Sequence, residues 1–216
     1  MMSDTENIEN DFAKCHITDN VSLYLDSIIK NNEYVKNCTS NKSKDPSSLS
    51  YLVDIQLSQS DCIKIGNGIE KVLSDIILDK NKLLRDIKEQ NIKGRKEKDH
   101  LFCCEESKTI YYAELKSNLN LDTEKCVSTH QKCNDILKEL QLLYPEYTVN
   151  MYLVSLRYCM KNMIPKQICK KYDCIKDNVV GVEEYLQILG VSVSFGLEEK
   201  YKQFLNNLAI EMFGTQ

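Results

Sequence analysis

A strand-like run that ends in two charged residues is the feature of this sequence with the clearest chemical potential. Residues 109–116 read TIYYAELK, so Glu114 and Lys116 are two positions apart. Side chains alternate across a β-strand, and this spacing therefore places the carboxylate and the ammonium on one face. Ala113 and Leu115 point to the opposite face, toward the expected core. The sequence predicts an acid and an amine side by side at the end of a buried strand.

A second carboxylate joins this pair if the chain forms a β-hairpin. Two short runs rich in aromatic, β-branched and apolar residues flank the polar segment 105–108, which is typical of a hairpin. The turn is expected to centre on Ser107 and Lys108. In that register Asp99 lies directly across from Lys116, and directly opposed residues share a face. Asp99 is therefore predicted to join the cluster, although a slip of one residue would move it to the other face.

Two carboxylates and an amine at the end of a sheet suit the metal-dependent hydrolysis of phosphodiesters. Hard oxygen ligands bind Mg²⁺ and leave coordination positions for water and phosphate. The cation polarises the phosphate and lowers the pKa of a bound water, while an ammonium orients that water and neutralises developing charge. The same acid-x-Lys triplet recurs at 86–88, 106–108 and 198–200. Those copies fall in expected helices or a turn, so the strand context distinguishes 114–116.

The elements around these residues predict a mixed α/β fold. Apolar residues recur at three- and four-residue steps across 67–90 and 122–143, which predicts two long amphipathic helices. Residues 148–158 predict a further strand, and two C-terminal helices are expected near 181–189 and 197–213. The order helix, hairpin, helix, strand is that of a unit in which helices flank a central mixed sheet.

The chain length of 216 residues favours one compact body with an N-terminal addition. Residues 21–35 carry apolar positions at near-helical spacing, and residues 38–50 are rich in Ser, Asn and Lys, as linkers often are. We therefore expect a helical N-terminal region and linker over 1–50 and one domain over 51–216.

Composition narrows the class of protein. The chain is 42% hydrophobic and 28% charged, which is typical of a globular protein. It has no apolar stretch long enough for a bilayer, and its N-terminus is acidic where a secretory signal would be basic and then apolar. Its ten cysteines are scattered through apolar and helical segments. We expect reduced thiols, a cytoplasmic location and no membrane partner.

The residues around the hairpin resemble a known family. The segments KDHLF (98–102) and YYAELKSNLNLDTEK (111–125) are similar to the catalytic core of type II restriction endonucleases in the PD-(D/E)xK superfamily. The resemblance covers roughly residues 65–160. The residue before Asp99 is Lys98 where the family pattern has proline, its weakest element.

This resemblance implies a restriction-endonuclease-like core with helical N- and C-terminal additions. It also implies that Asp99 and Glu114 bind Mg²⁺, that the Leu115 carbonyl is a further ligand and that Lys116 is the catalytic lysine. Family members often have another acid on the helix before the hairpin, for which Glu70 is the candidate. The implied activity is restriction of double-stranded DNA at a short site, with a DNA methyltransferase encoded separately.

DNA contacts are expected from basic and polar segments around this core. The net charge of −4 argues against nonspecific coating of nucleic acid, but residues 80–98 and 157–176 are locally basic. Residues 161–195 form the expected DNA-reading region, and two-fold sites predict a homodimer. The predicted contacts are Lys93, Arg95, Lys96, Asn118, Asn120, Lys125, Lys166, Lys170, Lys171 and Tyr172. Asn118 and Asn120 are equally expected as turn or capping residues.

Other interpretations of the sequence remain open. The chain could be a repair or recombination nuclease of the same superfamily, or a noncatalytic helical interaction protein in which the triad is a structural ion pair. Cys126, His130 and Cys133 have helical spacing that permits a zinc site, although we favour buried thiols. The pairs Cys103/Cys104 and Cys169/Cys174 are read in the same way, as packing residues rather than nucleophiles or ligands.

Overall fold

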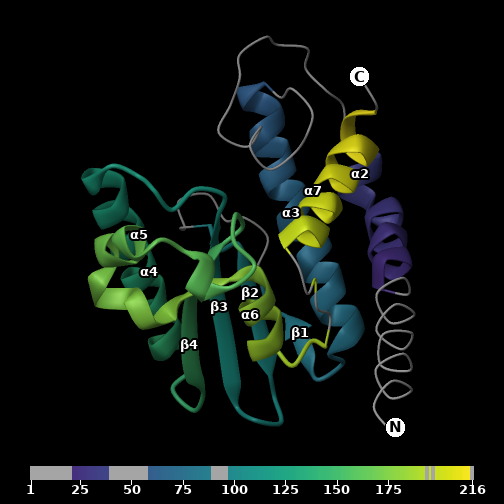
Figure 1. Cartoon of the computed structure of the whole chain (residues 1–216). Helices are drawn as coiled ribbons and strands as arrows, with labels where there is room; N and C mark the ends of the chain where they lie inside the picture. The colour runs from purple at the N-terminus through teal and green to yellow at the C-terminus, as the bar shows by residue number, and fades with distance from the viewer. Residues whose placement is uncertain (1–20, 39–57, 89–96, 193–194, 196–197, 215–216) are drawn as a thin grey trace, which may run out of the picture.

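A five-stranded mixed sheet forms the centre of the computed structural model, which describes residues 21–38, 58–88, 97–192, 195 and 198–214 (Figure 1). The strands lie in chain order: β1 (Leu84–Asp86), β2 (His100–Cys104), β3 (Thr109–Lys116), β4 (Thr148–Ser155) and β5 (Val179–Gly181). The first three pair antiparallel, whereas β3, β4 and β5 pair parallel. The parallel half buries β3 and β4 between neighbours, which suits their apolar sequences.

Helices cover both faces of this sheet (Figure 1). One face carries α3 (Gln59–Lys80) and α6 (Val182–Ile188), with α7 (Glu198–Phe213), the helical residues 21–31 and α2 (Glu33–Lys36) packed around α3. The other face carries α4 (Thr123–Leu143), α5 (Lys166–Lys171) and the 3-10 turns Lys161–Met163 and Asp173–Asn178. The mixed α/β class with a helix-flanked central sheet is thus confirmed.

The two long helices begin at side-chain caps. The hydroxyl of Ser58 accepts a hydrogen bond from the backbone N–H of Asp61 at 3.1 Å, at the start of α3. Asp122 does the same for the N–H of Lys125 at 2.9 Å, at the start of α4. Each bond satisfies one of the backbone donors that a helix leaves free in its first turn. The Ser58 cap thus sets the first residue of α3, and the Asp122 cap sets the first residue of α4.

The sheet separates two apolar clusters. On the α3 side, buried residues of α3, α6 and α7 pack with Leu25, Ile29 and Val35, so the N-terminal helices share this core. On the α4 side, Tyr112 and Leu153 of the sheet pack against the buried stripe of α4. Burial of these side chains on both faces is what holds the central strands in place.

The expected helix over 67–90 is wrong at its C-terminal end. The helix α3 ends at Lys80, and the following residues form β1. Asn81 turns the chain, because its side-chain amide donates to the Leu189 carbonyl at 2.7 Å and its oxygen accepts from the Leu83 N–H at 3.0 Å. Leu84 is then buried in the sheet. Three residues of strand are too short to show a period of their own.

The hairpin forms, but its register differs from the prediction by two residues. Cys104 pairs with Thr109 and His100 with Ala113, so the turn consists of the four residues 105–108. Its last residue, Lys108, adopts a positive φ of 50°. The predicted opposition of Asp99 and Lys116 is therefore wrong. Because side chains alternate with a period of two, a two-residue shift keeps Asp99 on the predicted face.

Among the helices of the described segments, none combines the length and the apolarity needed to cross a bilayer. The eight cysteines that the structure describes in full are free thiols, and six of them are buried.

Candidate active site

Glu114 is the centre of a buried polar cluster on the α4 face of the sheet. Its side chain is completely buried, with 0% of its surface exposed. The Lys116 ammonium donates to Glu114 Oε1 at 2.6 Å, and the Tyr112 hydroxyl donates to Oε2 at 3.1 Å. Three alternate residues of β3 thus meet as the strand period predicts. Burial tends to lower the pKa of Lys116, but the attraction of Glu114 outweighs it and the pKa is raised.

Lys132 of α4 completes the cluster and was missed by the sequence analysis. Its ammonium lies 2.8 Å from Glu114 Oε1 and 2.7 Å from Oε2. A signal for it did exist, because Lys132 lies three residues after buried Thr129 and four before buried Ile136. On a helix those spacings place a residue at the edge of the buried stripe. A lysine there reaches any acid on the sheet that the helix covers.

Asp99 lies at a bend directly before β2, beside this cluster. Its Oδ2 accepts a hydrogen bond from the Leu115 N–H at 2.6 Å. Burial, followed by repulsion from Glu114, raises the pKa of Asp99 to about 6, although Leu115 N–H, Lys116 and Lys132 act in the opposite direction. Two carboxylates are therefore close enough to repel each other, which is the situation that a bound cation relieves.

Glu70 of α3 is connected to Asp99 through a lysine. Lys88 forms a short hydrogen bond to Glu70 Oε1 and donates to the Asp99 carbonyl at 2.9 Å. Burial tends to lower the pKa of Lys88, but the hydrogen bond to Glu70 and the negative charges of Glu70 and Asp86 together outweigh it, and the pKa is raised. The Glu70 carboxylate is thus neutralised by Lys88, with Lys71 at 3.6 Å as a second partner. The candidate additional acid is an ion-paired residue that braces the Asp99 backbone.

The oxygen donors of this cluster fit a hard divalent cation. Asp99 and Glu114 offer carboxylates, which Mg²⁺ prefers over nitrogen or sulfur. The Leu115 N–H points to Asp99, and in a strand the carbonyl of a residue points to the same side as its N–H. No group of three or more His, Cys, Asp or Glu side chains within the described residues could hold a metal. A cation here would need backbone and water oxygens besides the two carboxylates.

In the part of the chain that the structure describes, the cysteine pattern in α4 does not form a metal site either. Cys126 and Cys133 are buried against the sheet, and His130 Nε2 lies 2.8 Å from the side-chain amide of Asn134. The three do not assemble a zinc site in the described structure. Burial, followed by the charge of Glu114, raises the pKa of Cys133 to about 11, so its thiol is protonated at neutral pH.

The predicted DNA-binding residues have different positions. Tyr172 is only 1% exposed, and its hydroxyl donates to the Leu119 carbonyl at 3.1 Å, so its predicted role in DNA contact is wrong. The side chain of Asn118 accepts from the Asn120 N–H at 2.8 Å, which makes it a turn residue. Lys171 ties this turn to α5, because it donates to Asn120 Oδ1 and the Leu121 carbonyl, each at 2.8 Å.

Three other predicted contacts have exposed side chains: Lys125, Lys166 and Lys170. Lys125 is paired with Asp122 at 3.1 Å but remains 69% exposed. The remaining three, Lys93, Arg95 and Lys96, lie outside the described residues.

One buried hydroxyl near the cluster has no hydrogen-bond partner. Ser155 is completely buried, and its Oγ is the single unpartnered buried side-chain oxygen or nitrogen among the described residues. In the parallel pairing of β3 and β4 it lies opposite Lys116, on the same face. The sequence offered no sign of this position.

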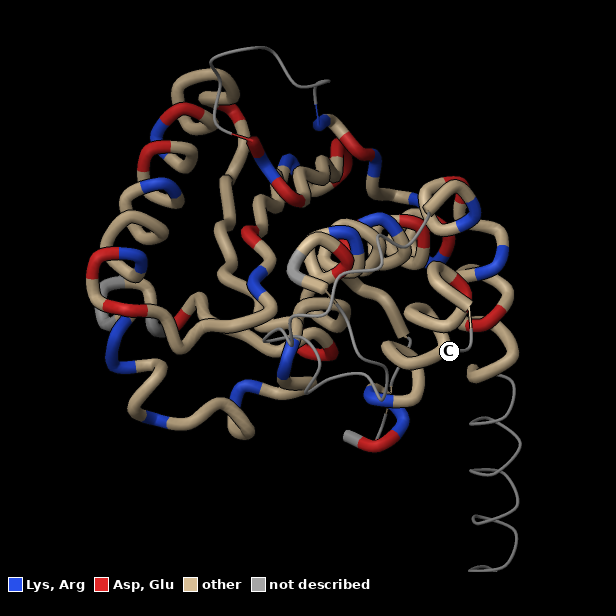
Figure 2. The backbone as a smooth tube through the Cα atoms, turned by 90° about the horizontal axis from the view of Figure 1, so that it is seen from above, with Lys and Arg blue, Asp and Glu red and all other residues tan. Residues whose placement is uncertain are grey.

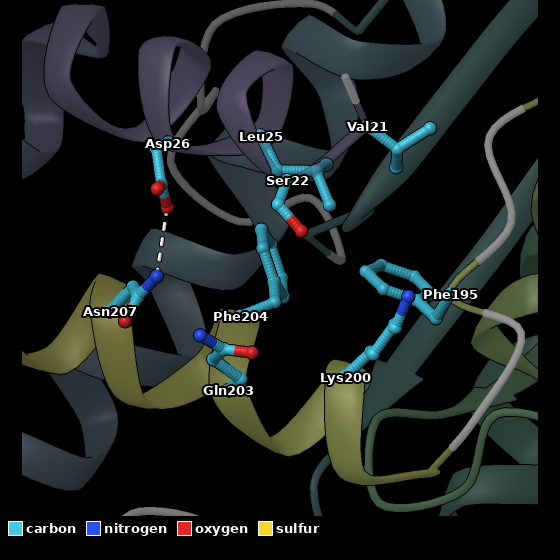
Figure 3. A pocket seen from close by; sticks show the side chains of 9 residues that line it. All are labelled: Val21, Ser22, Leu25, Asp26, Phe195, Lys200, Gln203, Phe204 and Asn207. Atoms are coloured by element: carbon cyan, nitrogen blue, oxygen red, sulfur yellow. Dashed lines mark hydrogen bonds between the residues drawn. The ribbon is translucent and has the colours of Figure 1, made fainter. Parts of the chain in front are cut away.

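Hollows beside and away from the cluster differ in their lining. A cleft of about 480 Å³ begins at Asp99 and extends over α3 toward α2, and five acids and two lysines line it. A second one, of about 40 Å³, lies between residues 21–26 and α7 (Figure 3). Leu25, Phe195 and Phe204 line this gap, which none of the candidate catalytic residues reaches. The acidic cleft is unsuited to a phosphate backbone, and the second hollow is a packing gap.

Comparison of the chain with family models, with curated proteins and with solved structures found no match.

Proposed function

We propose that this protein is a Mg²⁺-dependent endonuclease of the PD-(D/E)xK type that hydrolyses phosphodiester bonds of DNA. The observation that carries the proposal is the convergence of Asp99, Glu114 and Lys116 on one face at the end of β3. A buried carboxylate and a half-buried one that repel each other, with an ammonium beside them, form a site with affinity for a dication and a phosphate.

Each residue has a defined task in this proposal. A bound Mg²⁺ would polarise the phosphate and acidify a water. Asp99 and Glu114 would bind the cation, and the Leu115 N–H keeps the Asp99 carboxylate in place. The Leu115 carbonyl, on the same side of the strand, is the further ligand. Lys116 would orient the attacking water and neutralise charge on the phosphate, and its raised pKa keeps it protonated at neutral pH.

The arrangement of elements also supports the PD-(D/E)xK assignment. A helix leads into an antiparallel set of three strands, a second helix crosses over, and a parallel strand follows beside β3. In this order the two acids fall at the start of β2 and the end of β3. The pattern of the sequence predicts the same order of helix, hairpin, helix and strand.

A basic segment beside the cluster suggests how double-stranded DNA would bind. From Arg157 to Lys171 the chain has five basic residues and no acid, and in Figure 2 this segment follows the lower left edge of the molecule. Exposed Lys166 and Lys170 can contact phosphates, which gives affinity without reading sequence. We infer a homodimer on a short two-fold site, paired in the cell with a separately encoded DNA methyltransferase. A nuclease specific for DNA structure is the alternative within the superfamily.

One observation favours a noncatalytic alternative. Both oxygens of Glu114 already accept from lysines, and Tyr112 adds a third donor. A buried carboxylate satisfied in this way can serve structure alone. Metal binding separates the two functions, since a structural ion pair has no affinity for Mg²⁺.

Plasmid cleavage tests the proposal. Purified protein with Mg²⁺ should give discrete bands that disappear with EDTA and in Lys116→Ala. Lys138→Ala is the matched control, because it removes an exposed lysine of α4 that lies outside the cluster and outside the predicted DNA contacts. Discrete bands support the restriction activity, and cleavage confined to branched or nicked substrates favours the structure-specific nuclease. Intact DNA together with no heat of Mg²⁺ binding in calorimetry would leave the noncatalytic alternative.

A further inference from the structure

The buried cluster contains one ammonium more than Glu114 needs. Glu114 is a single carboxylate, yet Lys116 and Lys132 both contact it. The Lys132 ammonium contacts both oxygens, at 2.8 Å and 2.7 Å, and the Lys116 ammonium contacts Oε1 at 2.6 Å. Holding a second ammonium, partly desolvated, against one carboxylate has a cost that a merely structural pair does not require. The position of Lys132 therefore calls for a further role.

A count of charges indicates that role. Asp99 and Glu114 bring two negative charges, and Lys116 and Lys132 bring two positive charges. The cluster is neutral in this form. A dication added to it gives a net charge of +2, which suits a phosphodiester and an attacking hydroxide. Without Lys132 the loaded cluster would have one positive charge less at the point where negative charge develops.

We propose that Lys132 is a second catalytic lysine, which holds Glu114 until a divalent cation takes over this carboxylate and then binds the scissile phosphate. This inference rests on the proposed nuclease function. Lys132 comes from α4 on a long flexible side chain that is 27% exposed, so its ammonium can leave Glu114 while the helix stays in place. A cation that uses Oε2 as a ligand would therefore displace the Lys132 ammonium, which lies 2.7 Å from that oxygen.

The proposal predicts opposite effects on metal binding and on catalysis. Replacing Lys132 by Met removes the competitor for Glu114, so Mg²⁺ should bind at about tenfold lower concentration. The same change removes an ammonium from the phosphate, so cleavage at saturating Mg²⁺ should slow by about 100-fold. Lys132→Arg should have the opposite effect on Mg²⁺ affinity. The planar guanidinium binds a carboxylate at two points, so a higher Mg²⁺ concentration should be needed to displace it.

The experiment measures Mg²⁺ affinity of the full chain by calorimetry and the rate of plasmid cleavage across a Mg²⁺ titration. Wild type, Lys132→Met, Lys132→Arg and the control Lys138→Met, which removes an exposed lysine of the same helix, are compared, each after a thermal melt. If Lys132→Met does not fold, the inference is tested by comparing the Mg²⁺ affinity and the cleavage rate of Lys132→Arg with those of the control. Wild-type rate and Mg²⁺ dependence in the Lys132 variants would overturn this inference and leave the nuclease intact. A wild type that neither binds Mg²⁺ nor cleaves would overturn both.

Discussion

Asp99 and His100 are neighbours in the chain, yet they lie on opposite faces of the sheet and their ionisation is shifted in opposite directions. Burial and Glu114 raise the pKa of Asp99 to about 6, and burial lowers the pKa of His100 to about 4. In both cases burial disfavours the charged form, which is the deprotonated carboxylate of Asp99 and the protonated imidazolium of His100. The same physical cause thus shifts the pKa values of two neighbouring residues in opposite directions.

The partners on the two faces explain what each environment can do. On the α4 face, ionised groups are packed together, with two lysines on Glu114. On the α3 face, His100 has neutral partners, because Nε2 bonds the Glu70 carbonyl at 2.9 Å and Nδ1 the Tyr185 hydroxyl at 3.2 Å. Buried charges that repel each other suit a cation or a substrate, whereas a satisfied neutral histidine suits a stable core. The comparison teaches that a displaced pKa alone does not identify a site.

The largest effect expected from this comparison is on activity. Asp99→Asn removes a metal ligand and should reduce DNA cleavage by about 1,000-fold or more, since the cation loses one of its two carboxylates. His100→Phe should leave the rate nearly unchanged at a temperature where the protein is folded, because the α3 face takes no part in the chemistry. Rates of plasmid cleavage at saturating Mg²⁺ test both. Equal losses in the two variants would contradict the division between the faces.

A second effect is on stability as a function of pH. Folded His100 has its pKa near 4 against 6.5 for the unfolded residue, so between those values the unfolded chain binds a proton that the folded chain does not. Its contribution to the free energy of unfolding, about 3 kcal/mol, is therefore present above pH 6.5 and lost as pH falls toward 4.

Asp99 acts in the opposite sense. Its folded pKa of about 6 lies above the unfolded value of 3.8, so the folded chain binds the proton first and gains stability as pH falls through 6. In Asp99→Asn only the His100 contribution remains, so the free energy of unfolding in urea should be lower at pH 4.5 than at pH 7. In His100→Phe only the Asp99 contribution remains, so the free energy of unfolding should be higher at pH 4.5 than at pH 7. The same pH dependence in both variants would show that these two groups do not control it.

The smallest effect is expected at Ser155. Its buried hydroxyl has no partner among the described residues, and an unpaired buried hydroxyl costs free energy. Ser155→Ala should raise the free energy of unfolding by about 1 kcal/mol, as measured by urea titration. Cleavage should be unchanged, since Lys116 beside it is bound to Glu114. A loss of stability would mean that the hydroxyl has a partner, such as a water.

Much of the fold follows from periodicity. The helix at 123–143, the strand at 148–155 and the C-terminal helices match their predicted positions closely, because long amphipathic patterns report which face is buried. The strand β1 was missed, since a three-residue strand carries no period and its apolar residues continue the spacing of α3. The register of the hairpin was missed because the turn has four residues with Lys108 at positive φ, a conformation that its sequence does not require.

By itself the sequence determined that Glu114 and Lys116 share a face. It predicted Asp99 on the same face, but the hairpin register that puts it there was decided by the structure. Only the tertiary structure decided that Lys132 reaches Glu114, that Lys88 joins Glu70 to Asp99, and that Tyr172 is buried. The reason is that alternation along a strand is local geometry, fixed by covalent structure. Contacts between a helix and a sheet depend on how far the helix is rotated and shifted, which the packing of the whole core sets.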